Sequence, residues 1–165
     1  DGTDTLIKIQ GHLSKFNPHY EILKNNKIVK VIFNGPHQYI SPRWYKSGRD
    51  VPTWAYCVVH IQGEVTLEES FEDICRNLKD LTENFEIGEE AWSFELPADL
   101  QEPEAVTRAI SAFSITPTKI EAKFKLNQKR PMIDQFSVIK ALGEQNDEMS
   151  QAVQALMKKI LSSQT

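Results

Sequence analysis

The order of strand-like and helix-like segments is the feature that most constrains how this chain can fold. Alternating or β-branched, aromatic-rich stretches predict strands over 5–13, 27–33, 37–45, 53–67 and 112–126. Helical spacing of apolar residues and helix-start signals predict helices over 18–25, 68–86, 102–111, 131–143 and 147–162. Because strands and helices do not alternate regularly, a parallel sheet is not expected. We predict a mainly β fold with flanking helices, in which an antiparallel barrel carries the helices on its outside.

Two helix starts carry clear local signals. Asn17 precedes Pro18, which is an N-cap residue followed by a proline at the first helical position. Thr66 and Glu69 have the spacing of a capping box and are expected to open the clearest helix of the chain. The terminal helix has its own apolar stripe, which predicts packing on the barrel or on a partner subunit.

Two proline-containing sites are expected to break strands. Asn34-Gly35-Pro36 is a strong turn signal and should end the strand over 27–33. Pro117 lacks a backbone N–H for a sheet ladder and should interrupt the strand over 112–126. These signals predict that the segment 37–45 is a strand of its own.

The length of 165 residues fits one domain with a helical appendage. We expect a barrel domain over 1–130, which includes the helix 68–86, and a C-terminal helical extension over 131–165 packed on it. The sequence has neither an apolar run of about 20 residues nor a secretion signal. Cys57 and Cys75 lack metal-type spacing, so a reduced, cytoplasmic setting and no membrane partner are expected. The chain begins at Asp1 rather than Met, so we expect position 1 not to be the translation start.

Charge is distributed unevenly behind the formal net charge of −4. Residues 68–104 hold thirteen acidic residues against Arg76 and Lys79, whereas residues 119–130 hold five basic residues against Glu121. An anion-binding site is therefore expected to use the basic segments and to avoid the acidic one. The alternative is that the acidic stretch is only the solvated face of a helix and loop.

A cluster of rings and cations lies between residues 39 and 56. Its aromatic residues are Tyr39, Trp44, Tyr45, Trp54 and Tyr56, and its polar and basic residues are Ser41, Arg43, Lys46, Arg49 and Thr53. A planar ligand that carries a phosphate needs these residue types together, because rings hold the plane while cations and hydroxyls hold the phosphate. The same residue types also concentrate in a barrel core and a subunit interface, so both interpretations stay open.

The segment KFKLNQKR, residues 123–130, is the second candidate. In a strand, Lys123 and Lys125 point to one face while Phe124 and Leu126 point into the core. Such a strand can present two ammonium groups to a phosphate, although lysines also protect a solvated edge strand from aggregation. The four histidines do not have the spacing of a metal site, and we predict no metal and identify no catalytic residue.

Four segments resemble the PaiB family of FMN-binding negative transcriptional regulators. They are GHLSKFNPHY (11–20), GPHQYISPRWY (35–45), VPTWAYCVVHIQG (51–63) and KFKLNQKR (123–130). The resemblance implies a split β-barrel like that of pyridoxamine-phosphate oxidases and flavin reductases, with FMN bound at the interface of a homodimer. It implies that the cofactor-binding residues are Tyr39, Ser41, Trp44, Tyr45, Pro52, Thr53, Trp54, Lys123, Lys125, Gln128 and Arg130.

This chain departs from the family pattern at three places. Ala55 stands where the family usually has Asn, and a methyl group cannot make the hydrogen bonds of an amide. Asn127 and Lys129 stand where Ser and Asn are usual. Members normally carry further strands before the position of Asp1 and a longer turn before the VPTW segment. We therefore expect either unrecorded residues there or a barrel that lacks its first strands.

The leading functional hypothesis is an FMN-binding, dimeric, bacterial regulator. The alternatives are a flavin-dependent oxidoreductase, which would be a flavin reductase or oxidase, and a split-barrel dimer that has lost flavin binding. Direct DNA binding follows from the family name alone, because the terminal helices mix basic and acidic residues and show no helix-turn-helix signature.

Overall fold

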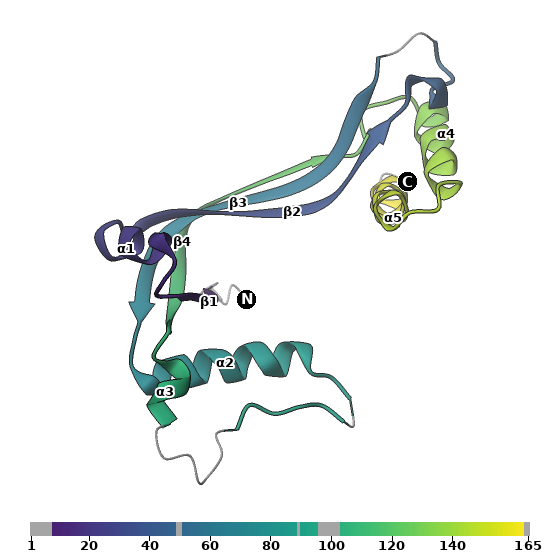
Figure 1. Cartoon of the computed structure of the whole chain (residues 1–165). Coiled ribbons are helices and arrows are strands. Elements are labelled where there is room, and N and C mark those ends of the chain that lie inside the picture. The colour runs from purple at the N-terminus through teal and green to yellow at the C-terminus, as the bar shows by residue number, and fades with distance from the viewer. Residues whose placement is uncertain (1–7, 49–50, 89, 96–102, 164–165) are drawn as a thin grey trace, which may run out of the picture. The chain divides into compact units, whose positions relative to one another are not determined.

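The computed structural model describes residues 8–48, 51–88, 90–95 and 103–163. The elements are β1 (Ile9–Ser14), α1 (Pro18–Asn25), β2 (Ile28–Ile40), the 3-10 helix η1 (Pro42–Trp44), β3 (Thr53–Glu68), α2 (Phe71–Phe85), α3 (Pro103–Thr107), β4 (Ile110–Lys125), α4 (Met132–Gly143) and α5 (Glu148–Ser162). The strands form one sheet in the order β1-β4-β3-β2, and neighbouring long strands run in opposite directions (Figure 1). The antiparallel, mainly β class predicted from the sequence is therefore confirmed.

The chain forms two compact units. Unit 1 comprises Asp1–Lys30 and Ile61–Lys119, and unit 2 comprises Val31–His60 and Ile120–Thr165. These boundaries cut β2, β3 and β4, so each long strand contributes residues to both units. The division expected from the sequence, 1–130 and 131–165, stays a prediction.

Unit 1 is built on the pairing of β1 with β4. The two strands are antiparallel, from Ile9 opposite Ile115 to Ser14 opposite Ile110, and β1 alternates half-buried with exposed residues as predicted. Helix α1 begins where the sequence predicts, because the side chain of Asn17 accepts a hydrogen bond from His19 N at 2.9 Å. Tyr20 of this helix is buried, and its hydroxyl donates to Glu69 at 2.5 Å.

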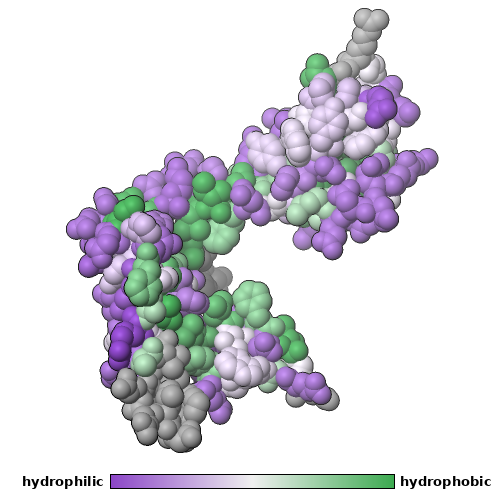
Figure 2. Space-filling view, in the orientation of Figure 1, coloured by the Kyte–Doolittle hydropathy of each residue, from purple (hydrophilic) through white to green (hydrophobic). Residues whose placement is uncertain are grey.

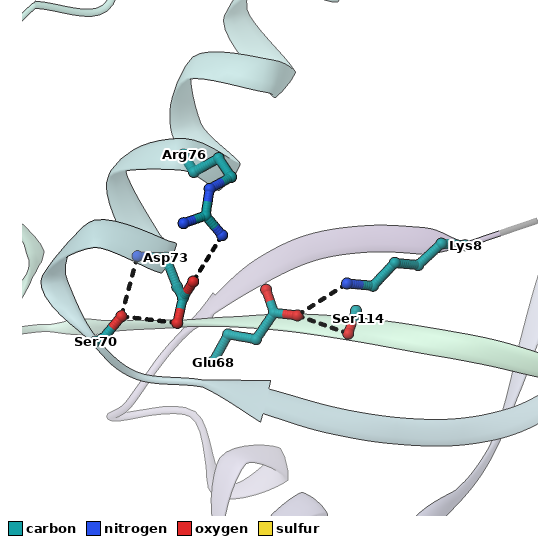
Figure 3. A network of polar contacts seen from close by, with 6 residues as sticks. All are labelled: Lys8, Glu68, Ser70, Asp73, Arg76 and Ser114. Carbon is teal, nitrogen blue, oxygen red and sulfur yellow. Dashed lines mark hydrogen bonds and ion pairs between the residues drawn. The ribbon is translucent and has the colours of Figure 1, made fainter.

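Helix α2 starts later than its capping-box signal predicts. Strand β3 continues through Glu68, and the N-cap is Ser70, whose hydroxyl accepts from Asp73 N at 3.1 Å and donates to the Asp73 carboxylate at 2.7 Å. Arg76 donates to the same carboxylate at 2.7 Å, and Glu68 accepts from Lys8 at 3.1 Å (Figure 3). The cap prediction at Thr66 is wrong because the sheet pairing extends over that residue.

The apolar residues of α2 are buried only in part. Ile74 is 2 % exposed, whereas Phe85 near the C-terminal end is 78 % exposed. Figure 2 shows apolar surface on and around this helix. The helix therefore fixes its first turns against unit 1 and leaves apolar side chains accessible near its last turn.

Unit 2 has one hydrophobic core. It joins residues at the ends of the strands to the two C-terminal helices, and its buried members are Ile40, Tyr45, Ala55, Cys57, Leu126, Val138, Ile139, Leu142, Val153, Met157 and Leu161. Gln154 ties α5 to α4 by donating to the Ile139 carbonyl at 2.8 Å. The stripe on the terminal helix therefore packs on this unit, as predicted.

Both strand-break predictions are wrong. β2 runs through Gly35 and Pro36 to Ile40, and β4 runs through Pro117. β2 is the outer strand in the sheet order, where a missing N–H can face away from the ladder. Pro117 lies two residues beyond Ile115, at which the described β1–β4 pairing ends. Residues 37–40 therefore continue β2 rather than forming a separate strand.

Candidate anion-binding groove

The last residues of β4 and the turn after it form the floor of a groove. Leu126 is 2 % exposed and anchors the turn in the core of unit 2. The Gln128 side chain holds the turn with two hydrogen bonds. Its Nε2 donates to the Phe124 carbonyl at 2.6 Å, and its Oε1 accepts from Leu126 N at 2.8 Å. Asn127 has a left-handed backbone with φ of 61°, a conformation that Asn adopts more readily than most residues. The turn is therefore held in one shape by its own amides.

This groove has a volume of about 490 Å³ and a basic lining. We call it the basic groove and define it by its lining residues, which are Thr53, Lys123, Phe124, Lys125, Asn127, Gln128, Lys129 and Arg130. Four of these residues are cationic, and within the described part of the chain no carboxylate is among them. The net field in the groove therefore favours an anion.

Thr53 of β3 joins the groove through Lys125. The Lys125 ammonium donates to the Thr53 hydroxyl at 2.6 Å and lies 6.0 Å from the centre of the Tyr56 ring. The guanidinium of Arg130 lies 4.7 Å from the centre of the Tyr45 ring, at cation–π distance. Two of the cations are therefore positioned against aromatic residues instead of extending freely into solvent.

One residue of the groove lining carries a buried polar atom that has no hydrogen-bond partner among the described residues. It is Nδ2 of Asn127, a donor whose desolvation costs free energy unless an acceptor reaches it. A phosphate supplies several acceptor oxygens and negative charge, and Asn127 lines the groove together with four cationic residues. The chemistry of the groove therefore fits a ligand with a phosphate group.

The basic groove collects five of the eleven predicted cofactor residues. Thr53, Lys123, Lys125, Gln128 and Arg130 line it. Of the other six, Tyr39 and Trp54 form an edge-on ring pair at 6.2 Å, and both rings are more than two-fifths exposed. His37 also contacts Trp54, with ring centres 6.2 Å apart.

The remaining predicted residues have structural positions. Ser41 is buried and caps η1, accepting from Arg43 N and Nε at 3.3 Å each. Tyr45 belongs to the core of unit 2, Trp44 packs against that core, and Pro52 is exposed. None of these residues is in the groove lining. Arg49, part of the predicted cationic cluster, lies outside the described residues.

Ala55 lies in the core and does not line the groove. It is 1 % exposed and is grouped with the apolar side chains of unit 2. An amide at this position would be surrounded by apolar groups in this chain. The departure from the family pattern therefore removes no side chain from the lining of the basic groove.

Three lining residues, Phe124, Asn127 and Lys129, belong to the candidate segment 123–130 but not to the eleven predicted cofactor residues. The prediction that Phe124 points into the core is wrong, because its side chain is 45 % exposed and lines the groove. Asn127 carried a usable signal, because Asn directly after a strand is typical of a left-handed turn position. The orientation of its amide depends on that turn and could not be read from spacing.

A buried carboxylate holds the turn that follows η1. Asp134, which is fully buried in the first turn of α4, accepts from Lys46 N at 2.7 Å and from the Ser47 N and hydroxyl at 2.9 and 2.5 Å. The Ser47 hydroxyl, these two backbone N–H groups and the nearby Arg130 hold the pKa of Asp134 below its ordinary value. The carboxylate thus fixes the turn after η1 in unit 2.

The described residues show no feature of a metal site or of a membrane-spanning helix. No three His, Cys, Asp or Glu side chains gather closely enough there to hold a metal ion. No helix in that part of the chain is long and apolar enough to span a bilayer.

Comparisons with known proteins agree on one family. Residues 1–119 match the model of the family described as "Putative FMN-binding domain". The protease synthase and sporulation protein PAI 2 of Bacillus subtilis is 32 % identical over 94 % of this chain and 74 % of its own length. An uncharacterized protein of Aspergillus fumigatus is 26 % identical over 91 % of this chain and 71 % of its own.

A solved structure shares the fold. The FAD and heme binding protein of Mycobacterium smegmatis aligns with a TM-score of 0.52 at 18 % identity, over 72 % of this chain and 53 % of that chain. This chain therefore spans little more than half of that protein. The family match includes the cluster of rings and cations between residues 39 and 56, with Thr53, but it ends before Lys123. Together these likenesses confirm the sequence-based family and split-barrel assignment, and the chain belongs to the FMN-binding domain family related to PAI 2.

Proposed function

We propose that this chain binds FMN and that the basic groove of unit 2 holds the FMN phosphate. One observation carries the proposal: the buried Asn127 Nδ2 lacks an acceptor in a groove with four cationic residues. Lys123, Lys125 and Lys129 supply the charge, and the Thr53 hydroxyl holds Lys125 in place at 2.6 Å. Membership in the FMN-binding domain family supports FMN as the phosphate-bearing ligand.

The exposed ring pair supports a place for the flat part of the ligand. Tyr39 is 42 % and Trp54 53 % exposed, although large aromatic side chains are usually well buried. We propose that these rings cover the isoalloxazine or the subunit interface beside it. FMN, when bound, supplies the redox chemistry, while the chain binds the phosphate and orients the ring.

We propose further that the working form is a homodimer in the cytoplasm. Exposed large apolar side chains support the dimer, and within unit 2 they include Phe33, Phe124, Ile133 and Phe136. Both cysteines are free thiols, which supports a reducing compartment. Light scattering coupled to size exclusion measures the mass, and a monomer at micromolar concentration would contradict the dimer.

The output we propose is regulation, as the PaiB resemblance implies. The basic groove offers support for a nucleic-acid contact, but a flavin-dependent reductase or oxidase uses the same groove. Stopped-flow mixing of the flavin-loaded protein with NADH or NADPH separates them, because a reductase bleaches the flavin absorption. A gel shift at low salt with promoter and random DNA tests direct DNA binding.

The experiment for the groove is an FMN titration followed by quenching of flavin fluorescence. Lys125→Ala should weaken binding by about tenfold, because it removes a charge-assisted hydrogen bond. Thr53→Val should weaken it by a smaller factor, since it removes only the group that positions Lys125. Lys140→Ala is the matched control, because it removes a positive charge from α4 outside the groove and should leave affinity unchanged.

Two results would contradict the proposal. Wild-type protein that neither carries flavin after purification nor takes up added FMN removes the cofactor. Equal loss of affinity in Lys125→Ala and Lys140→Ala shows that only net charge matters, and the groove is then not the site.

A further inference from the structure

A second cleft lies in unit 1 between α2 and β1. It has a volume of about 220 Å³, and its lining residues are Gln10, Gly11, Asn77, Asp80, Leu81 and Asn84. The four residues from α2 follow helical spacing, so they lie on one face of the helix. We call this the α2–β1 cleft.

The cleft contains a buried acceptor without a donor. Asn77 is only 4 % exposed, and its Oδ1 has no hydrogen-bond partner within the described part of the chain. Leaving a buried carbonyl oxygen unsatisfied is costly, and such groups in folded proteins call for an explanation. A ligand that donates an N–H into the cleft would satisfy it.

The charge of the cleft is negative. Asp80 lines it and has no ion pair or side-chain hydrogen bond among the described residues. The two basic residues of α2 are already engaged, because Arg76 pairs with Asp73 at 2.7 Å and Lys79 with Glu83 at 3.7 Å. The cleft therefore offers a buried amide oxygen and a carboxylate to the same ligand.

We propose that the α2–β1 cleft binds the ammonium group of a small aliphatic amine. The ammonium donates to Asn77 Oδ1 and to the Asp80 carboxylate, and the alkyl chain lies along Leu81, which is 41 % exposed. The volume of about 220 Å³ lies below the roughly 300 Å³ at which pockets for drug-sized molecules begin, so it suits a short chain. This proposal does not depend on FMN binding.

The test uses ¹⁵N-labelled full-length chain and n-butylammonium chloride, followed through the side-chain amide resonance of Asn77. We expect a saturable shift of that resonance. The neutral isostere 1-butanol and tetramethylammonium, which carries charge but no N–H, should give none. No saturable shift with n-butylammonium, or an equal shift with tetramethylammonium, overturns the proposal.

Variants locate the site. Asp80→Asn should weaken n-butylammonium binding by about tenfold, the loss typical of a hydrogen bond to a charged group. Glu72→Gln removes the same charge from α2 outside the cleft and should leave the affinity unchanged. Equal affinities in wild type and Asp80→Asn would overturn the assignment.

Asn77→Leu separates a ligand site from a structural one. If Oδ1 serves as an acceptor for the ligand and is unpaired without it, replacing the amide by an apolar group should abolish amine binding without lowering Tm. A variant that is less stable but still binds the amine overturns the proposal. If the variant does not fold, the comparison of Asp80→Asn with Glu72→Gln decides the question.

Discussion

The basic groove of unit 2 and the α2–β1 cleft of unit 1 make a matched pair with opposite signs. Each contains one buried carboxamide with an atom that lacks a partner, Nδ2 of Asn127 in the groove and Oδ1 of Asn77 in the cleft. The donor belongs to a residue that lines the groove with four cationic residues, whereas the acceptor belongs to a residue that lines the cleft with Asp80. The comparison teaches that the same side chain can prepare a site for an anion or a cation, depending on its orientation and its charged neighbours.

The two sites draw on the two charged segments of the sequence to different extents. Four of the five basic residues of segment 119–130 line the groove, whereas Asp80 is the one carboxylate of segment 68–104 in the described lining of the cleft. Among the described lining residues each site has charges of one sign only, so no opposite charge within the same lining cancels its field. Variants that change one site should leave the other intact.

The largest expected effect is charge reversal in the groove. Lys123→Glu combined with Lys125→Glu should weaken FMN binding by at least about 100-fold, because two charge-assisted contacts are lost and replaced by repulsion. The affinity for n-butylammonium should stay unchanged, which a parallel titration measures. A matching loss in both titrations would break the comparison, since it would mean that the two sites are not independent.

The next effect is on the stability of unit 2. Asp134→Asn should lower Tm by several degrees, because an amide cannot accept all three hydrogen bonds from Lys46 and Ser47. In wild type the contribution of this carboxylate is present above the ordinary Asp pKa and is lost as pH falls through its lowered pKa. A Trp92→Phe background leaves Trp44 and Trp54, both in unit 2, as fluorescence reporters. An unchanged unfolding midpoint in that background contradicts the assigned role of Asp134.

The smallest effect is expected in unit 1. Tyr20→Phe removes the hydrogen bond to Glu69 and should lower the free energy of unfolding by about 1 kcal/mol. The loss is smaller than for a fully buried charged pair, because the Glu69 side chain is 44 % exposed. That hydrogen bond and burial raise the pKa of Tyr20 to about 12. The stabilisation is therefore complete below pH ~10 and is lost as pH rises through 12.

Urea unfolding followed by circular dichroism measures both the stability cost of Tyr20→Phe and its dependence on pH. The difference between wild type and Tyr20→Phe should shrink above pH ~10. The lowered pKa of Glu69, caused first by the same hydrogen bond, adds a second loss as pH falls through it. A difference that is constant from neutral pH to pH 12 would exclude the hydrogen bond as its source.

Local features of the fold could be predicted from the sequence, whereas features set by strand partners could not. Asn17 and Pro18 define a helix start through their own backbone and side chains, and the structure agrees. The continuity of β2 depends on its place in the sheet. A Cβ at Gly35 would lie 3.1 Å from Cys57 Cβ, so the glycine allows close approach of β3 instead of forming a turn.

The candidate groove was predictable in part for the same reason. Strand alternation placed Lys123 and Lys125 on one face, and the family pattern added Thr53. Asn127 was not among the predicted cofactor residues because its amide is oriented by a left-handed turn directly after the buried Leu126, and strand alternation does not predict such a turn. Asn77 has a weaker sequence signal, as a polar residue at helical spacing from the apolar residues Ile74 and Leu81 of α2.

The most direct measurement of the central claim compares FMN with riboflavin, which has the same ring system but no phosphate. Both are titrated into the wild-type chain and into the Lys123→Glu/Lys125→Glu variant. We predict that wild type binds FMN at least about tenfold more tightly than riboflavin, and that the variant loses this preference. Equal affinities of the wild-type chain for FMN and riboflavin would contradict the assignment of the phosphate to the basic groove.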